Sequence, residues 1–248
     1  MMSHRFLSFI ALAFVVFANP SLAGEYRKII DKGVTFHTFI ADAGELKIHW
    51  KNADGTAIRK LDALAASLQS DGHKIQFLGN AGIFMENGTP LGLHIENGKE
   101  LRPVNQVKEA FGNFYLQPNG IFFIEDGKAK ITTTDQYLKG NHRPTLATQS
   151  GPMLVIDGNI HPKFNANSTN RTYRNGVGIL PDGRILFAIT DHTLTSRVNL
   201  HGFATMFLKQ GCQNALYLDG GLSAVRIPAA NIRIDTGREL GSLLSISK

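Results

Sequence analysis

Residues 177–190 read VGILPDGRILFAIT, which is two apolar runs separated by a Pro-Asp-Gly turn. Both runs are short and rich in Val, Ile, Leu and Phe, a composition typical of β-strands. A short loop that contains glycine joins antiparallel neighbours, because glycine adopts the backbone conformations that tight turns need. The stretch therefore predicts a hairpin of two antiparallel strands, residues 177–180 and 185–190.

The same pattern of apolar runs between turn residues extends outward in both directions. It predicts further strands at residues 34–40, 46–50, 75–78, 91–96, 112–116, 121–125, 153–156, 215–218 and 243–246. The first two of these flank Asp42-Ala43-Gly44 and are expected to form a hairpin with each other.

Two segments have helical rather than strand periodicity. Apolar residues recur at positions i, i+3, i+4 and i+7 in residues 61–68 and again in residues 200–207. Two helices among many strands, without regular βαβ alternation, predict an α+β fold. We expect a mixed, largely antiparallel sheet of many short strands with two main helices.

Composition supports one ordinary folded domain. The 248 residues are 43% hydrophobic and 19% charged, and 25 Gly and nine Pro are turn residues in numbers that argue against an all-α protein. The single cysteine, Cys212, can form neither an intrachain disulfide nor a cysteine-based zinc site. The formal charge of +6 is diffuse, with no Lys/Arg run longer than two, so nucleic acid is not an expected partner.

The first 23 residues resemble a signal peptide. Arg5 precedes an apolar run over residues 6–17, and Ser21-Leu22-Ala23 offers small residues to a signal peptidase. We expect cleavage after Ala23 and a mature domain over residues 24–248, exported to the periplasm or the medium, with no stable membrane insertion. An uncleaved anchor is the alternative, although about a dozen apolar residues are short for a membrane span. Loss of Arg5 lowers the formal charge from +6 to +5.

Four polar turns at strand ends contain the candidate functional residues, because loops on a rigid sheet can aim polar groups. Each residue also has a plain structural alternative. An asparagine can stabilise its own turn, surface arginines are commonly solvated, and Asp-Gly is a common hairpin turn. The candidates are Asn80 in the first turn, Gln149, Ser150 and Gly151 in the second, Arg174 in the third, and Asp219, Gly220, Gly221 and Ser223 in the fourth.

These four turns, in this order, resemble the signature of the phosphodiester glycosidase family, in its bacterial exported branch. The matching strings are NAGIF at 80–84, QSGPMLV at 149–155, RNGVGI at 174–179 and ALYLDGGLS at 215–223. The sequence departs from the family at Ala81 and Leu222, where glycine is common. The resemblance spans about residues 36–248 and implies cleavage of the bond between a sugar anomeric carbon and a phosphodiester.

That reaction suggests a role for each candidate. A phosphate leaves without the protonation that a sugar alkoxide needs, so one carboxylate and a phosphate clamp could suffice. Asp219 is the expected catalytic carboxylate, with Asp191 as the second candidate, and Arg174 is the expected phosphate clamp. Sugar or phosphate contacts are expected from the remaining candidates, which are Asn80, Gln149, Ser150, Gly151, Thr190, Gly220, Gly221 and Ser223.

Other chemistries find less support. The nine histidines lack the i, i+4 spacing of a helical zinc site, so neither a metal nor another cofactor is expected. Ser150 lies in no Gly-x-Ser-x-Gly elbow, and Cys212 is expected to be a buried, inert thiol. A non-catalytic envelope module that binds an anionic glycan or glycan-phosphate remains the rival. Such a module gains nothing from Asp219, since like charges repel.

Overall fold

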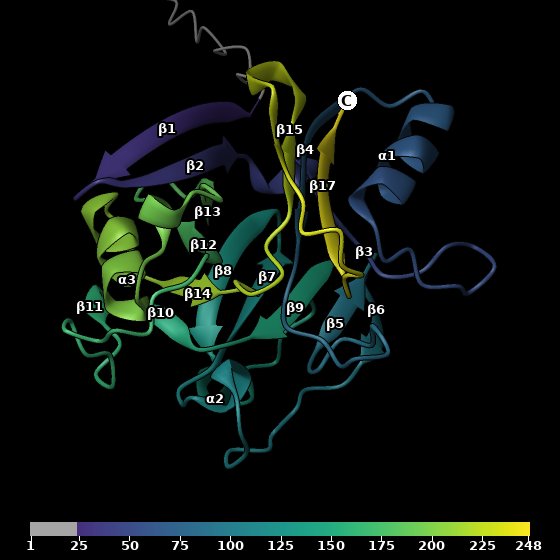
Figure 1. Cartoon of the computed structure of the whole chain (residues 1–248). Coiled ribbons are helices and arrows are strands. Elements are labelled where there is room, and N and C mark those ends of the chain that lie inside the picture. The colour runs from purple at the N-terminus through teal and green to yellow at the C-terminus, as the bar shows by residue number, and fades with distance from the viewer. Residues whose placement is uncertain (1–23) are drawn as a thin grey trace, which may run out of the picture.

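Three antiparallel sheets form the fold, and the computed structural model describes residues 24–248 (Figure 1). The seven-stranded sheet has the order β1-β2-β13-β12-β14-β10-β11. Its strands are β1 (Glu25–Asp31), β2 (Val34–Ala41), β13 (Ile185–Thr190), β12 (Asn175–Ile179), β14 (Ala215–Tyr217), β10 (Met153–Ile156) and β11 (Asn159–Ile160). The hairpin expected from residues 177–190 is confirmed as β12 and β13, with Val177 opposite Phe187.

The other two sheets have five strands each. One has the order β16-β15-β4-β17-β3, from β16 (Ile232–Ile234), β15 (Val225–Ile227), β4 (Ile75–Asn80), β17 (Leu243–Ser247) and β3 (Leu46–His49). The other has the order β6-β5-β9-β7-β8, from β6 (Lys99–Arg102), β5 (His94–Glu96), β9 (Leu146–Ser150), β7 (Gly120–Glu125) and β8 (Lys128–Thr133).

A shared apolar core joins the sheets. Phe77 from β4 stacks on Phe39 from β2, with ring centroids 5.1 Å apart, and on Phe187 from β13 at 4.8 Å. Phe122 from β7 meets Phe187 edge-on at 6.4 Å. Offset and edge-to-face rings of this kind add to the hydrophobic gain of burial. One aromatic cluster therefore fixes the three sheets relative to one another.

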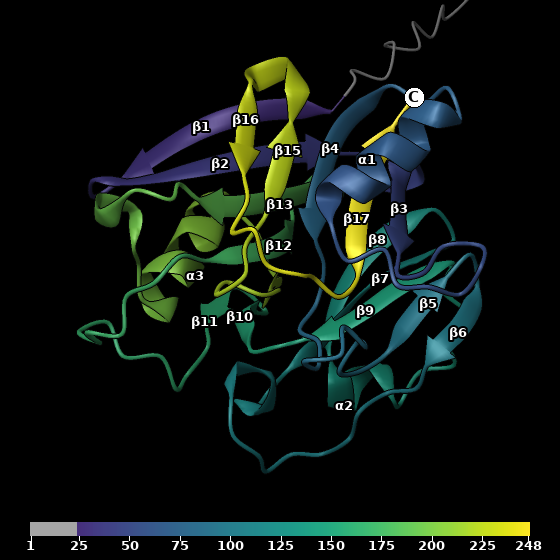
Figure 2. The ribbon, with the colours of Figure 1, turned by 45° about the vertical axis from the view of Figure 1, so that its right-hand side comes forward.

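Helices cover the outer faces. α3 (Leu200–Lys209) packs Phe203 and Phe207 against the seven-stranded sheet, and α1 (Leu61–Ser70) packs its apolar side against β4 and β17. Both match the predicted helical segments. α2 (Thr134–Tyr137) is a short third helix that begins with a capping box at Thr133. α1 and α3 lie on opposite sides of the molecule (Figures 1 and 2).

The α+β prediction is confirmed, but two local predictions were wrong. Strands 34–40 and 46–50 do not pair: β2 lies between β1 and β13, whereas β3 pairs with β17. The unpredicted strand β1 and the strand β13 occupy both edges of β2, so no edge remains for β3. Residues 112–116 contain a 3₁₀ turn over Asn113–Tyr115 rather than a strand. In addition, the strands form three separate sheets rather than the one predicted, and every strand pairing in them is antiparallel.

The predicted signal peptide, residues 1–23, lies outside the described residues. Within residues 24–248, no helix is both long and apolar enough to span a bilayer.

Candidate active site

The candidate site lies where strands from all three sheets end. Antiparallel pairing brings Thr190, at the end of β13, and Tyr217, at the end of β14, to the same rim as the start of β12. Asn80 ends β4 in the second sheet, and Ser150 ends β9 in the third. Strand ends from three sheets therefore assemble residues that lie far apart in sequence.

Direct hydrogen bonds tie these strand ends to the turn after β14. Ser150 Oγ donates to the carbonyl of Leu218 at 2.9 Å, and Asn80 Nδ2 donates to the carbonyl of Asp219 at 3.2 Å. Asn80 Oδ1 accepts from Asn175 Nδ2 at 2.8 Å and from the backbone N–H of Ala224 at 2.9 Å. Asn80, Ser150 and Asn175 are buried. Their hydrogen bonds hold the turn after β14 in place. Their amide and hydroxyl groups therefore have most of their hydrogen-bond partners within the protein.

We expect Asn80→Ala to lower the free energy of unfolding by about 1–3 kcal/mol, because it leaves the buried N–H of Ala224 without its acceptor. Urea unfolding measures the effect. The control is Asn52→Ala, which removes an exposed asparagine bonded to Thr56 and should change stability by no more than about 0.5 kcal/mol. Equal unfolding midpoints for the two variants would refute the bracing role of Asn80.

The Asp219 turn closes on itself. Ser223 Oγ donates to the carbonyls of Asp219 and Gly220, at 3.1 and 2.8 Å, and the N–H of Gly220 donates to Tyr217 Oη at 2.8 Å. A Cβ on Gly220 would lie 2.6 Å from the carbonyl oxygen of Tyr173, so close backbone contact requires glycine there. Nothing lies within 4 Å of the corresponding position on Gly221, which faces open space.

Asp219 is the titratable group of this turn. Burial raises the pKa of its carboxyl from 3.8 to about 6, although hydrogen bonds from the backbone N–H groups of Gly221 and Leu222 favour the ionised form. A carboxyl with this pKa exchanges protons near neutral pH, which suits general acid–base chemistry. Perturbed groups of this kind cluster at functional sites.

The raised pKa of Asp219 also predicts a pH-dependent stability. The folded protein holds this proton more tightly than the unfolded chain, so stability falls as pH rises from about 4 to about 6 and then levels off. Asp219→Asn removes this penalty. Denaturant titrations should therefore show the variant gaining stability over the unmodified protein between pH 4 and 7.5, by up to about 3 kcal/mol.

Asp54→Asn is the control of opposite sign, since hydrogen bonds from Thr56 lower the pKa of exposed Asp54. Any loss in that variant should appear at neutral pH and disappear in acid. A stability difference between Asp219→Asn and the unmodified protein that does not change with pH would contradict the assignment.

Arg174 lies on the same rim and is 2% exposed. Its Nε donates to the carbonyl of Val198 at 3.1 Å, Nη1 to Tyr217 Oη at 3.3 Å, and Nη2 to the carbonyl of Asn170 at 3.3 Å. Tyr217 Oη thus connects Arg174 directly to the N–H of Gly220 in the Asp219 turn. A guanidinium has five N–H donors, so two remain for a ligand.

A cavity of about 140 Å³ opens against Arg174. It is lined by Leu116, Lys163, Phe164, Asn165, Ser168, Asn170, Arg174, Leu200 and His201. The arginine therefore has both unbonded donors and a space in which an anion could meet them.

Three predicted site residues have other roles in the structure. Thr190 Oγ1 accepts the backbone N–H of Arg174 at 2.9 Å. Gly151 is packed so closely that a Cβ would lie 2.7 Å from Asn119 Cβ. Gln149 Oε1 accepts from the N–H groups of Leu93 and Asn105, and its Nε2 donates to the Asn105 carbonyl and to Thr134 Oγ1. Both atoms of the Gln149 side-chain amide are therefore fully hydrogen-bonded within the protein. These residues shape the rim rather than offer free polar groups.

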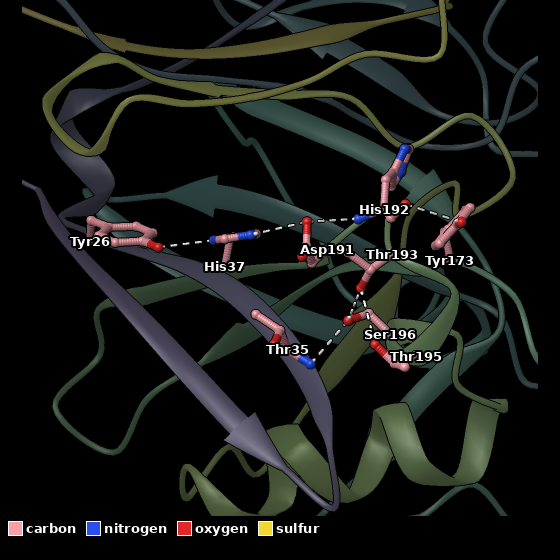
Figure 3. A network of polar contacts seen from close by, with 9 residues as sticks. All are labelled: Tyr26, Thr35, His37, Tyr173, Asp191, His192, Thr193, Thr195 and Ser196. Atoms are coloured by element: carbon pink, nitrogen blue, oxygen red, sulfur yellow. Dashed lines mark hydrogen bonds and ion pairs between the residues drawn. The ribbon is translucent and has the colours of Figure 1, made fainter.

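Asp191, the second candidate carboxylate, belongs to a different network (Figure 3). Its Oδ1 lies 3.6 Å from His37 Nε2 and accepts the backbone N–H of His192 at 2.9 Å. His37 Nδ1 in turn meets Tyr26 Oη at 2.9 Å, and burial lowers the pKa of His37. The His192 ring stacks on Tyr173 with centroids 4.3 Å apart. Asp191 thus has a supporting role visible in the structure.

Sequence reasoning missed two residues that organise the site. Asn175 bridges β12 to Asn80, and Tyr217 bridges Arg174 to Gly220. Both stand inside the motifs that carried the resemblance, and their position beside Arg174 and two residues before Asp219 was the available signal. Cys212 is buried, and burial raises the pKa of its thiol to about 12, as expected for an inert cysteine. Among residues 24–248, no three His, Cys, Asp or Glu side chains are grouped to hold a metal ion.

The described residues form an α+β fold in which Asp219 follows the end of β14, and the turn that carries it is joined to buried Arg174 through Tyr217. A model of the phosphodiester glycosidase family matches residues 73–242, which include Asn80, Arg174 and Asp219. The chain belongs to this family. It is also 35% identical over 191 residues to the uncharacterized protein YigE of Escherichia coli K12, covering 77% of this chain and 72% of that protein.

Solved structures share the fold at low identity. The catalytic domain of zebrafish N-acetylglucosamine-1-phosphodiester alpha-N-acetylglucosaminidase, auto-inhibited by its pro-peptide, superposes with a TM-score of 0.65 at 17% identity, over 93% of this chain and 84% of that one. A hypothetical protein from Synechocystis matches with a TM-score of 0.54 at 14% identity, over 90% and 61%. A putative exported protein from Burkholderia pseudomallei K96243 matches with 0.53 at 11%, over 86% and 74%.

Proposed function

We propose that this protein is an exported hydrolase that cleaves a glycosyl-1-phosphodiester and releases the sugar. The observation that carries the proposal is the Asp219 carboxyl, whose pKa is raised to about 6, in a turn that Tyr217 joins to buried Arg174. The Asp219 carboxyl is suited to proton transfer or charge stabilisation at the anomeric carbon, and the Arg174 guanidinium is suited to binding the phosphate.

The reaction needs one bond broken and one formed. Water adds its oxygen to the anomeric carbon, the bond from that carbon to the phosphate oxygen breaks, and the phosphate monoester leaves with the electron pair. Asp219 either takes the proton released by water or stabilises the oxocarbenium-like transition state. The two unbonded N–H donors of Arg174 hold the phosphate, whose negative charge grows as the bond breaks.

Export rests on the sequence of residues 1–23, and its destination would be the periplasm or the medium. An envelope or extracellular glycan is the proposed source of the substrate. The zebrafish relative is described as acting on an N-acetylglucosamine-1-phosphodiester, which makes that compound a rational first probe.

The test incubates the purified chain with methyl esters of several sugar 1-phosphates and measures free sugar and methyl phosphate separately. Equal release of both products from a reaction in oxygen-labelled water, with no label in the methyl phosphate, supports the proposal. Release of methanol and sugar 1-phosphate would show instead that the bond between phosphorus and the methanol oxygen breaks, which contradicts the proposal. Binding without any turnover across the panel would favour the non-catalytic glycan-binding module.

A further inference from the structure

Two neighbouring cavities lie beside the first turn of α3. The Arg174 cavity is the space of about 140 Å³ described above. The Arg171 cavity has a volume of about 240 Å³ and is lined by Asp31, Lys32, Val34, Phe36, Ala166, Arg171, Val198, Asn199, His201, Gly202 and Thr205. His201 and the loop of residues 163–171 contribute to both. Both fall below the roughly 300 Å³ typical of pockets for drug-sized ligands, so each suits one small group.

The charges around the cavities are predominantly positive. Lys163 and Arg174 line the first cavity, and Lys32 and Arg171 line the second. Asp31 is the one carboxylate among the lining residues, and both its oxygens accept from Lys209 Nζ at 2.8 Å. A cationic lining with its single carboxylate already paired favours an anionic ligand.

The cations are not engaged elsewhere in ion pairs. Within residues 24–248, neither Lys32, Lys163, Arg171 nor Arg174 forms a salt bridge. The side chain of Arg171 donates from Nε to the carbonyl of Arg197 at a long 3.5 Å. Buried Arg174 keeps two donors beside its cavity, as counted above.

The loop of residues 163–171, which contributes to both cavities, is held in place by hydrogen bonds. Asn199 Nδ2 donates to the carbonyls of Ala166 and Ser168, both at 3.0 Å, while Asn199 Oδ1 caps α3 by accepting the N–H of Gly202 at 2.8 Å. One residue therefore holds the loop against the start of the helix. The positive end of the helix dipole adds to the field that the four cations create.

We propose that the ligand carries two phosphate groups, one held by Arg174 and the next held by Lys32 and Arg171 in the Arg171 cavity. This rests on the proposed function for the identity of the first phosphate as the cleaved diester. The sugar then lies toward Asp219, and the alcohol released with the phosphate extends past His201 and bears the second phosphate. A glycan or polyol chain with repeating phosphodiesters has this chemistry.

The first experiment measures binding without turnover. Glycerol 1-phosphate and glycerol 1,3-bisphosphate contain no anomeric bond, so calorimetric titration at low ionic strength reports the phosphate sites alone. We expect the bisphosphate to bind about fivefold more tightly than the monophosphate. Lys32→Ala and Arg171→Ala should each remove most of that advantage, while the monophosphate still binds at Arg174.

Lys74→Ala is the matched control, because Lys74 is an exposed lysine directly before β4 and lines neither cavity. It should leave both dissociation constants unchanged. Equal affinity of the unmodified protein for the two compounds would overturn the proposal. A loss in Lys74→Ala as large as that in Arg171→Ala would also overturn it, since general charge attraction would then explain the binding.

A kinetic measurement separates this inference from the proposed function. Sugar 1-phosphodiesters of glycerol and of glycerol phosphate differ only in the second phosphate, and Arg171→Ala should raise KM about fivefold for the second compound alone. Equal KM values for the two compounds with the unmodified enzyme would refute the two-phosphate site and leave the glycosidase proposal intact. If neither compound is cleaved, the glycosidase proposal fails, whereas the calorimetric ratio still decides the second site.

Discussion

Asp219→Asn should lower kcat on a cleavable sugar 1-phosphodiester by roughly 10²-fold or more while the fold is preserved. The substitution keeps the size of the side chain and one oxygen that can accept from the N–H groups of Gly221 and Leu222. It removes the charge that would receive a proton from water or stabilise a developing cation. Because the carboxylate is the active form in either role, the rate of the unmodified enzyme should rise with pH and level off above about pH 6.

Steady-state kinetics from pH 4.5 to 8 measures both effects, with circular dichroism as the folding control. Asp191→Asn is the comparison, and we expect a much smaller loss, because Asp191 contacts His37 and the backbone of His192. Near-normal turnover in Asp219→Asn together with a large loss in Asp191→Asn would transfer the catalytic assignment to Asp191. Loss of the pH dependence in Asp219→Asn would identify Asp219 as the group that titrates.

Arg174→Lys should raise KM by about tenfold or more and change kcat less. Lysine keeps the positive charge but cannot reproduce the planar fork that contacts Val198, Tyr217 and Asn170 while presenting two further donors. The expected loss is therefore in phosphate binding rather than in proton transfer, and the affinity for inorganic phosphate should fall in parallel.

Arg184→Lys is the matched control, since Arg184 lies in the exposed turn between β12 and β13 and pairs with Asp182. It should leave KM and phosphate affinity unchanged. Arg174→Lys could also lower stability through the lost backbone contacts, so unfolding should be measured on the same samples. Unchanged phosphate affinity in a folded Arg174→Lys variant would show that Arg174 only braces the rim.

Local sequence patterns determined much of the secondary structure. The continuous apolar run of residues 185–190 follows from a strand buried on both faces: Phe187 and Ile189 face the core between the sheets, while Leu186 and Ala188 face α3. The spacing of apolar residues likewise determined α1 and α3. The position of Asp219 after an apolar strand was visible for the same reason, because a strand end and its turn are neighbours in sequence.

Tertiary structure alone decided which strands pair and which polar atoms remain available. β2 pairs with β13, and β3 pairs with β17. The paired strands lie far apart in sequence and share no connecting turn, so turn residues do not predict which strands pair. Asn80 reaches Asp219 across 139 positions, and Ser150 reaches Leu218 across 68. Gln149 and Arg174 look equally polar in sequence, yet the fold uses every amide atom of the first and leaves two donors on the second. The physical reason is that periodicity reports only the burial of local segments, whereas hydrogen bonding and desolvation depend on neighbours that only the packed sheets bring together.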